Sequence, residues 1–299
     1  DLSQNENRSG LTHVKDTLEE LINILDERSK NKGSLTGIPT GFRDLDRILL
    51  GMQRKDLILL AARPSVGKTA LAVNIALNAA RNDHRVAIFS LEMSKAQLAQ
   101  RMLSSLSLIN LKNLISGDID EWEDIFQASS IIAEKSIYID DTAGISITEL
   151  RSKCRRLKAD GGLDFIMIDY LQHMTSEGRN ENRQQEISTI SRNLKALAKE
   201  LDVPILALSQ LSRDSEKSGR KPRLSDLRES GAIEQDADVV ILLFREDYQN
   251  EEAEVKNQIE LIIAKHRNGE TGSVELNFIK ECTRFIDLET NMDKELFNG

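Results

Sequence analysis

The sequence of 299 residues is poor in aromatic residues and in cysteine. Aromatic side chains make up 4% and hydrophobic side chains 39%, so a core has to be built mainly from aliphatic residues. Two cysteines, Cys154 and Cys282, are too few for a disulfide framework or for a four-ligand zinc site. We therefore expect both to be reduced thiols in a cytoplasmic protein.

Long apolar runs are missing as well. No run approaches the roughly 18 consecutive apolar residues that a membrane-spanning helix needs. The N-terminal stretch 1–10 is polar and therefore unlike a signal peptide. We expect neither a membrane protein nor a secreted one. The start at Asp1, without a methionine, leads us to expect a fragment of a longer protein.

Basic residues are outnumbered by acidic ones. The chain has 40 lysines and arginines against 49 aspartates and glutamates, which gives a formal net charge of -9. This balance argues against a surface that binds nucleic acid over its whole extent. It leaves room for a local basic channel, because binding depends on where the charge lies.

The apolar pattern divides the chain into residues 1–34 and residues 35–299. In the first part, apolar residues between Leu11 and Arg28 recur at helical spacing and predict an amphipathic helix. The polar, glycine-containing stretch 29–34 that follows is typical of a tether. A single helix of this length has to bury its apolar stripe, either on its own domain or on a neighbouring one.

From residue 35 onward, short aliphatic runs alternate with amphipathic segments. Strands are predicted at 56–62, 85–91, 136–140, 163–170 and 203–209, and helices at 70–81, 94–108, 147–159 and 185–201. Four closely spaced strands follow at 239–244, 258–264, 274–279 and 284–287. Continuous aliphatic strands interleaved with helices are typical of a parallel sheet covered on both faces. We therefore predict an α/β fold with a mostly parallel, twisted sheet flanked by helices and an antiparallel C-terminal extension.

The strongest chemical signal lies between the first predicted strand and the helix that follows it. It reads Ala62-Arg63-Pro64-Ser65-Val66-Gly67-Lys68-Thr69, followed by Ala70. A glycine-containing turn that opens a helix points backbone N–H groups at a phosphate, which makes this stretch a candidate nucleotide site. Lys68 would reach the β- and γ-phosphates, and the Thr69 hydroxyl would hold Mg²⁺. The alternative is a chance Gly-Lys-Thr at a turn, and a glycine usually stands where this chain has Ala62.

Three polar residues follow other predicted strands. Asp169 could hold the water shell of Mg²⁺ beside the phosphate loop, or it could cap the next turn. Glu92 could polarise a water against a γ-phosphate, or it could be an N-terminal acid of the following helix. Gln210 could contact the γ-phosphate, or it too could cap a turn. The residues alone leave these pairs of alternatives open.

Several motifs in a fixed order resemble one family. They are Gly37–Asp46, Ala61–Thr69, Phe89–Ser94, Ile168–Gln172, Leu208–Arg213, Asp226–Gly231 and Ala264–Gly269. Together they resemble the C-terminal motor domain of the bacterial and phage replicative DNA helicases of the DnaB type, from about Leu11 to Asp287. Ala62 matches this family's own variant of the phosphate loop.

The resemblance implies a RecA-like P-loop NTPase that forms a ring of six copies, with ATP and Mg²⁺ at the interfaces between subunits. Glu92 would be the catalytic base, and Asp169 would be the acid associated with Mg²⁺. Gln210 would link the γ-phosphate to the DNA loops, and Arg101 would contact the nucleotide.

The resemblance also implies residues that act between subunits and on DNA. Lys265 and Arg267 would reach the ATP of the neighbouring subunit, where a supplied cation stabilises the transferring phosphoryl group. Without the family, these two residues would be interpreted as an exposed basic hairpin. The implied DNA contacts are Arg228, Glu229 and Gly231 in the central channel, with Arg179 and Arg183 in a second pore loop.

The implied function is that of an ATP hydrolase and 5′ to 3′ replicative DNA helicase. Its partners would be single-stranded DNA, further copies in a homo-hexamer, primase and a helicase loader. The family's N-terminal collar, where primase usually engages, is missing from this sequence, so we expect a weaker ring and an impaired response to primase. Two other functions stay open, namely a RecA-type recombinase or related ATPase, and a nucleotide-regulated binding module without motor activity.

Overall fold

The computed structural model describes residues 13–30, 33–174, 183–211, 220–246 and 257–288. The chain forms two compact units, Asp1–Thr36 and Gly37–Gly299. The first unit contains one helix, and the second contains the sheet and the helices that pack on it.

Helix α1 (Val14–Lys30) carries a row of exposed apolar side chains. Among them, Val14 is 63% exposed, Ile22 is 62% exposed and Leu25 is 51% exposed. The amphipathic helix predicted for residues 11–28 is therefore confirmed from residue 14 onward. Its apolar side chains are solvent-exposed in the single chain.

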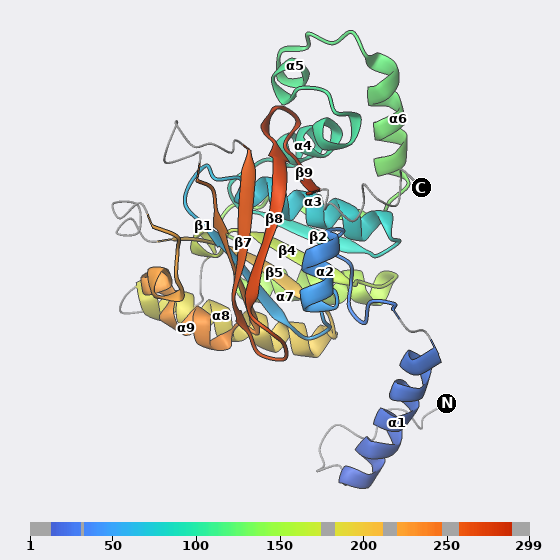
Figure 1. Cartoon of the computed structure of the whole chain (residues 1–299), viewed down its shortest axis with the longest axis vertical. Helices are drawn as coiled ribbons and strands as arrows, with labels where there is room; N and C mark the ends of the chain where they lie inside the picture. Colours follow the sequence, from blue (N-terminus) through green and yellow to red (C-terminus); the bar gives the residue numbers. More distant parts are fainter. Residues whose placement is uncertain (1–12, 31–32, 175–182, 212–219, 247–256, 289–299) are drawn as a thin grey trace, which may run out of the picture. The chain divides into compact units, whose positions relative to one another are not determined.

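The second unit is built around one nine-stranded sheet in the order β3-β2-β4-β5-β1-β6-β7-β8-β9 (Figure 1). Its strands are β1 (Leu57–Ala62), β2 (Val86–Ser90), β3 (Ile137–Asp140), β4 (Phe165–Asp169), β5 (Ile205–Gln210), β6 (Val239–Phe244), β7 (Gln258–His266), β8 (Gly272–Ile279) and β9 (Arg284–Asp287). Strands β1 to β6 pair in parallel, and β7, β8 and β9 extend the sheet in antiparallel fashion. The predicted sheet is confirmed, and each predicted strand is present.

Helices lie on both faces of this sheet (Figure 1). They are α2 (Arg43–Leu49), α3 (Lys68–Arg81), α4 (Lys95–Ser107), α5 (Leu111–Ser116), α6 (Trp122–Ala133), α7 (Ile147–Asp160), α8 (Arg183–Leu201) and α9 (Gly231–Asp236), with short 3₁₀ turns η1 (Leu171–His173), η3 (Leu224–Ser230) and η4 (Lys280–Cys282). The predicted helices are present as α3, α4, α7 and α8, whereas α2, α5, α6 and α9 were not predicted. None of the helices in the described part of the chain combines the length and the apolar character that crossing a bilayer requires.

The central strand β1 shows why its sequence is continuously aliphatic. All six of its residues are buried. Successive side chains of a strand point to opposite faces, so Leu60 packs in one core cluster with Leu71 of α3, and Leu59 packs in the other with Leu194 of α8. Each fully buried leucine contributes roughly 1.5–3 kcal/mol, so a polar residue on either face would be costly.

Candidate active site

Four adjacent parallel strands, β2, β4, β5 and β1, end at one edge of the sheet. The strand register places Ser90 beside Asp169 and Ala62 beside Gln210. Glu92 lies two residues beyond the end of β2. The loop and the strand-end residues that the sequence singled out therefore meet at the carboxyl edge, where open α/β sheets bind their ligands.

The loop between β1 and α3 has a backbone shape suited to a phosphate. Ser65 and Gly67 both have positive φ, at 61° and 115°. A Cβ at position 67 would lie 3.3 Å from the Phe285 ring, so backbone angle and space both favour Gly67. Gly67 caps α3, and its carbonyl accepts the Leu71 N–H at 2.9 Å. The first turn of α3 thus presents its N–H groups to the loop, where an anion is favoured.

A cavity of about 490 Å³ lies over this loop, which is a usual size for a ligand site. Its lining includes the predicted residues Arg63, Pro64, Ser65, Gly67, Lys68, Thr69, Ala70, Glu92, Arg101 and Gln210. Val66 was also predicted to bind the nucleotide, but its side chain is 3% exposed and packs in the core. Val66 therefore offers a ligand only its backbone.

Lys68, Thr69 and Asp169 form a polar group at the base of the loop. The Thr69 hydroxyl donates to Asp169 Oδ2 at 2.7 Å, and Lys68 Nζ lies 4.0 Å from Asp169 Oδ1. Burial raises the pKa of Asp169, although Lys68 and Thr69 oppose the shift. Burial also lowers the pKa of Lys68, against the attraction of Asp169 and Glu92. A phosphate group beside Lys68 would favour the charged form of the lysine.

The same group fits a magnesium ion. Asp169 Oδ1 is buried without a hydrogen-bond partner among the described residues, so it can accept a proton from a metal-bound water. The Thr69 hydroxyl lines the cavity and can bind the ion directly. Within the described ranges no cluster of three acidic, histidine or cysteine residues could hold a metal. Magnesium suits such a site, because it keeps several waters and binds one or two protein groups together with phosphates.

The turn between β2 and α4 holds Glu92 at the cavity. The Ser90 hydroxyl donates to the Met93 carbonyl at 2.6 Å and accepts the Met93 N–H at 3.2 Å. Ser94 then caps α4 in a capping box with Gln97. Glu92 therefore precedes the cap, and the first turn of α4 has no acidic residue. The alternative that Glu92 is an N-terminal acid of this helix does not fit, whereas an exposed carboxylate at the cavity does.

Gln210 and Arg101 reach the cavity from two different elements. Gln210 is the last residue of β5 and is exposed, whereas the other residues of that strand are buried. Arg101 lies on α4, where burial lowers the pKa of its guanidinium and Asp169 opposes the shift. Both positions agree with contact to a bound nucleotide.

Sequence reasoning missed several residues that line the cavity. Arg245 directly follows β6, so the strand-end rule that located Gln210 could have found it. Tyr170 follows β4, and Lys68 Nζ lies 4.7 Å from the centroid of its ring. Phe278 comes from the antiparallel strand β8, and no local signal in the sequence indicates that it lies beside the loop.

Lys265 and Arg267 lie at the opposite edge of the sheet. Lys265 is in β7, where it pairs with Val240 near the start of β6, and the Arg267 N–H donates to the Asp238 carbonyl at 2.8 Å. Because β6 runs parallel to β1, the start of β6 lies at the amino edge, away from the phosphate loop. The structure therefore does not bring these two predicted residues to the cavity of their own chain.

Comparison with known proteins identifies the family. The model of the DnaB-like helicase C terminal domain matches residues 37–287. The chain belongs to this family. Among solved structures, a helicase-type ATPase domain determined on its own matches it with a TM-score of 0.87 at 43% identity, covering 91% of this chain and 98% of that chain. This likeness confirms the RecA-like fold.

Further relatives of this DnaB-like domain are longer proteins. It is 51% identical over 298 residues to the replicative DNA helicase DnaC of Bacillus subtilis (strain 168), and covers 66% of that protein. It is also 51% identical to the replicative DNA helicase DnaB of Geobacillus stearothermophilus, again covering 66%. The structure of a DnaB-like replicative helicase, reported with its interactions with primase, matches with a TM-score of 0.85 at 42% identity, covering 94% of this chain and 68% of that chain.

In this DnaB-like domain, the residues predicted to contact DNA come from neighbouring elements. Arg228 and Glu229 lie in η3, Gly231 begins α9, Arg183 begins α8, and Arg179 lies outside the described residues. Helix α9 packs against both α8 and η3. The basic stretch before η3 is partly neutralised, because Arg220 donates to both oxygens of Asp226 at 2.9 and 2.7 Å.

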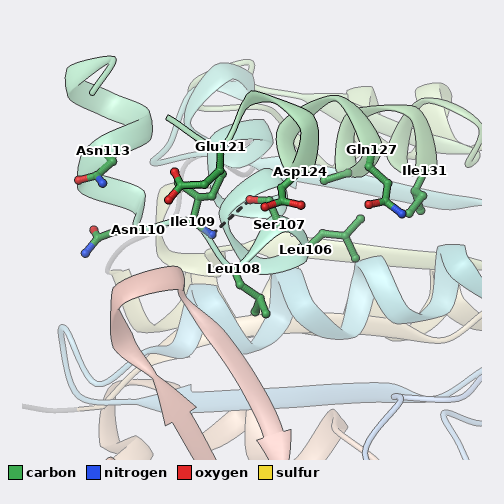
Figure 2. Close-up of a pocket in the computed structure, with 11 residues that line it drawn as sticks. Leu106, Ser107, Leu108, Ile109, Asn110, Asn113, Glu121, Asp124, Gln127 and Ile131 are labelled. Atoms are coloured by element: carbon green, nitrogen blue, oxygen red, sulfur yellow. Dashed lines mark hydrogen bonds between the residues drawn. The ribbon is translucent and has the colours of Figure 1, made fainter. Parts of the chain in front are cut away.

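The DnaB-like domain has a second cavity, of about 690 Å³, between α4, α5 and α6 (Figure 2). It is lined by Leu106, Ser107, Leu108, Ile109, Asn110, Asn113, Glu121, Asp124, Gln127, Ala128 and Ile131. None of these is basic, so a phosphate would find no counter-charge there. Exposed apolar side chains occur on the same elements, and we call Leu108, Ile115, Trp122 and Phe126 the α4–α6 surface.

Proposed function

We propose that this chain is the motor of an ATP-driven replicative DNA helicase that works as a hexameric ring on single-stranded DNA. The observation that carries the proposal is the cavity at the carboxyl edge, where Lys68, Glu92 and Gln210 surround a phosphate loop in a member of the DnaB-like family. Because the chain spans 66% of the length of its curated relatives, the activity of the whole protein is part of this proposal.

Hydrolysis uses the groups that the carboxyl edge gathers. ATP lies with its phosphates on the loop, and Lys68 binds the oxygens of the β- and γ-phosphates. Glu92 accepts the proton of the attacking water, as its exposed position at the cavity allows. Gln210 contacts the γ-phosphate from the end of β5, and Arg101 adds a positive charge from α4.

Magnesium completes the site. The Thr69 hydroxyl binds the ion, and Asp169 holds one of its waters through the oxygen that has no protein partner. When bound, the ion draws charge from the β- and γ-phosphates.

The cations that stabilise the transferring phosphoryl group come from a second copy. Strand β1 has six residues, and at about 3.3 Å per residue it separates the two edges of the sheet by roughly 20 Å. That distance is longer than either side chain, so Lys265 and Arg267 do not reach the ATP of their own chain. In a closed ring, the amino edge of one copy can face the carboxyl edge of the next.

Helix α1 ties neighbouring copies together. It exposes a row of apolar residues, and the α4–α6 surface exposes Trp122 at 51% and Phe126 at 64%. Exposed apolar patches of this kind mark interaction sites, and each would be covered by the other. Covering the α4–α6 surface with α1 of an adjacent copy buries both.

DNA passes through the channel of the ring. Arg228, Glu229 and Gly231 on η3 and α9, with Arg179 and Arg183 before and at the start of α8, contact the phosphates of one strand. Six copies concentrate this positive charge in the channel, although each chain carries a net charge of -9. Contact with the backbone carries no sequence information, so movement is independent of sequence. Translocation from 5′ to 3′, engagement of primase and a loader, and a cytoplasmic location complete the proposal.

The test measures the ATPase rate with and without single-stranded DNA, together with the mass in solution in the presence of an ATP analogue. We expect stimulation by DNA and a mass of about six copies. A monomer that hydrolyses ATP at full rate and ignores DNA would overturn the proposal. ATP binding without hydrolysis would indicate a binding module, and filaments that exchange strands would indicate a recombinase.

A further inference from the structure

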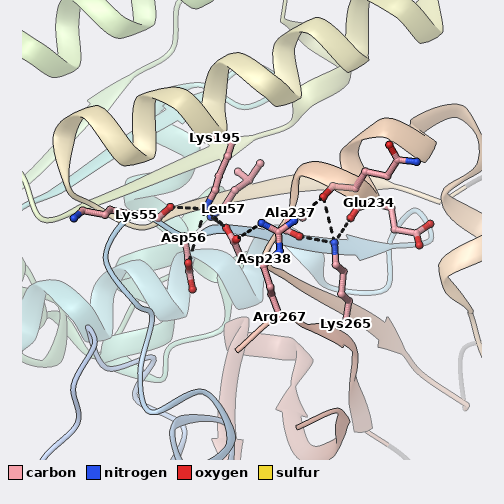
Figure 3. Close-up of polar contacts among 10 residues, drawn as sticks. Lys55, Asp56, Leu57, Lys195, Glu234, Ala237, Asp238, Lys265 and Arg267 are labelled. Atoms are coloured by element: carbon pink, nitrogen blue, oxygen red, sulfur yellow. Dashed lines mark hydrogen bonds and ion pairs between the residues drawn. The ribbon is translucent and has the colours of Figure 1, made fainter. Parts of the chain in front are cut away.

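A buried cluster of charges lies where Lys265 and Arg267 leave the sheet (Figure 3). At its centre is Asp238, whose side chain is 4% exposed. Asp238 Oδ2 accepts the Leu57 N–H at 2.9 Å and a hydrogen bond from Lys195 Nζ, and Oδ1 accepts one from Arg267 Nη1 at 3.3 Å. Both oxygens are therefore paired, so the carboxylate has a fixed orientation.

Lys195 does not neutralise this cluster alone. From α8 it donates to the Lys55 carbonyl at 2.7 Å, and it also lies 4.0 Å from Asp56 Oδ1. It is thus shared between two buried carboxylates, Asp56 and Asp238. The second positive charge that the pair requires is supplied by Arg267.

Arg267 is held through both its backbone and its side chain. Its N–H donates to the Asp238 carbonyl at 2.8 Å, and Nη2 donates to the Gln235 carbonyl at 3.2 Å. Half of the side chain remains exposed, at 51%. A guanidinium has five N–H donors, and the contacts to Asp238 and Gln235 leave others for a phosphate that approaches from outside.

Lys265 is held by the same stretch of chain. Its ammonium donates to the carbonyls of Glu234 at 2.6 Å, Ala237 at 2.8 Å and Gln235 at 3.4 Å. These carbonyls lie at the C-terminal end of α9 and just beyond it. Burial and the charge of Arg267 lower the pKa of Lys265, as expected for an ammonium that has left bulk water.

The segment 234–238 therefore holds both cations, and it continues directly from the predicted DNA contacts. Arg228 and Glu229 lie in η3, which leads without interruption into α9 at Gly231. Any shift of η3 and α9 on binding DNA moves the groups that position Lys265 and Arg267.

We propose that Asp238 is a positioning residue for ATP hydrolysis in the neighbouring subunit, because it orients the guanidinium of Arg267 while the carbonyls at the end of α9 orient Lys265. DNA contact and cation placement then depend on one segment. This inference rests on the proposed trans-acting roles of Lys265 and Arg267.

The first experiment replaces Asp238 by asparagine, which keeps a hydrogen-bond acceptor but removes the charge. We expect DNA-stimulated kcat to fall about 10- to 100-fold, as for the loss of a group that orients a catalytic residue. The KM for ATP should stay the same, because Asp238 lies at the edge of the sheet opposite to its own cavity. Glu200→Gln is the matched control, since Glu200 also pairs with two cations, Arg151 and Arg155, and its loss should leave kcat unchanged.

The second experiment mixes Asp238→Asn subunits with Lys68→Ala subunits, which cannot use their own ATP but supply unaltered cations. We expect more activity than the sum of the two proteins alone. No gain would overturn the inference if Arg267→Ala mixed with Lys68→Ala does gain activity, because Asp238 would then act only within its own fold. If neither mixture gains activity, the trans-acting function falls, and this inference falls with it.

A third variant covers the case in which Asp238→Asn does not fold, as judged by circular dichroism and nucleotide binding. Arg267→Lys sits on a half-exposed side chain and keeps the charge, but it loses the planar fork that reaches both Asp238 and Gln235. We expect kcat to fall at least about tenfold, with rescue by Lys68→Ala subunits. Turnover at the wild-type rate would overturn the inference, because charge alone would then suffice.

Discussion

At the scale of single residues, position at a strand end carries most of the chemical information. Asp169, Glu92 and Gln210 could be predicted because the carboxyl ends of parallel strands meet at one edge. Arg245 obeys the same rule but was missed, because a cation after a strand resembles ordinary surface charge. The Phe285 ring beside the phosphate loop could not be predicted, because it comes from the last strand of the sheet.

The assignment of Glu92 as the base predicts a separation of binding from hydrolysis. Glu92→Gln keeps the shape of the side chain but cannot accept the proton of water. We expect nucleotide binding to persist while DNA-stimulated hydrolysis falls about 10²- to 10⁴-fold. Binding is measured with a fluorescent nucleotide, and hydrolysis by phosphate release. Glu134→Gln, at an exposed carboxylate that ends α6, is the control, and unchanged hydrolysis in Glu92→Gln would remove Glu92 from its role.

The buried Asp56 makes stability depend on pH. Burial, assisted by the charge of Asp238, raises the pKa of Asp56 from 3.8 to about 6, although Lys195 and Arg267 oppose the shift. A raised pKa in the folded state means that the stabilisation is complete below pH 3.8 and is lost as the pH rises through about 6. Asp56→Asn stays neutral and escapes this loss. We therefore expect its melting temperature, relative to the wild type, to increase between about pH 4 and about pH 7. Thermal melts across this range check the prediction, and a difference independent of pH would contradict it.

At the scale of elements, length and burial decided what the sequence could predict. The strands of the parallel sheet are aliphatic and buried on both faces, so each was predicted. Helices α2, α5 and α9 have only six or seven residues, which is too short for a helical period to stand out. Helix α6 was missed although Trp122, Ile125 and Phe126 carry that period, and its exposed rings belong to the interaction surface.

The proposed contact between α1 and the α4–α6 surface can be tested with the single tryptophan of the chain, Trp122. Its side chain is 51% exposed in one copy, so its emission should shift to shorter wavelength when the ring assembles. The double variant Leu18→Asn and Leu25→Asn removes two leucines from α1. At about 1.5 kcal/mol or more for each leucine, we expect the association constant to fall at least about 100-fold. Lys15→Gln, on the polar side of α1, is the control, and an unchanged mass for the double variant would refute the contact.

At the scale of the whole molecule, the sheet separates the two halves of one reaction. The phosphate loop lies at its carboxyl edge, and Lys265 and Arg267 lie at its amino edge. Neither the distance nor the direction could be obtained from the sequence, because they depend on which strand pairs with which. A single chain is therefore an incomplete enzyme under the proposed function, and its activity becomes a property of interfaces.

That arrangement predicts how mixed rings behave. Arg267→Ala subunits keep a complete phosphate loop and lack the trans-acting cation, whereas Lys68→Ala subunits have the opposite defect. Each protein alone should lose about 10³-fold or more in DNA-stimulated hydrolysis, the usual effect of a trans-acting arginine. In an equal mixture, about a quarter of the interfaces of a head-to-tail ring join an intact loop to an intact cation, so activity should return in part. Hydrolysis is followed across the mixing ratio, with a maximum expected near equal amounts. If Lys265 and Arg267 served the ATP of their own chain instead, no mixture would contain an intact site, and activity would stay at the level of the separate variants at every ratio.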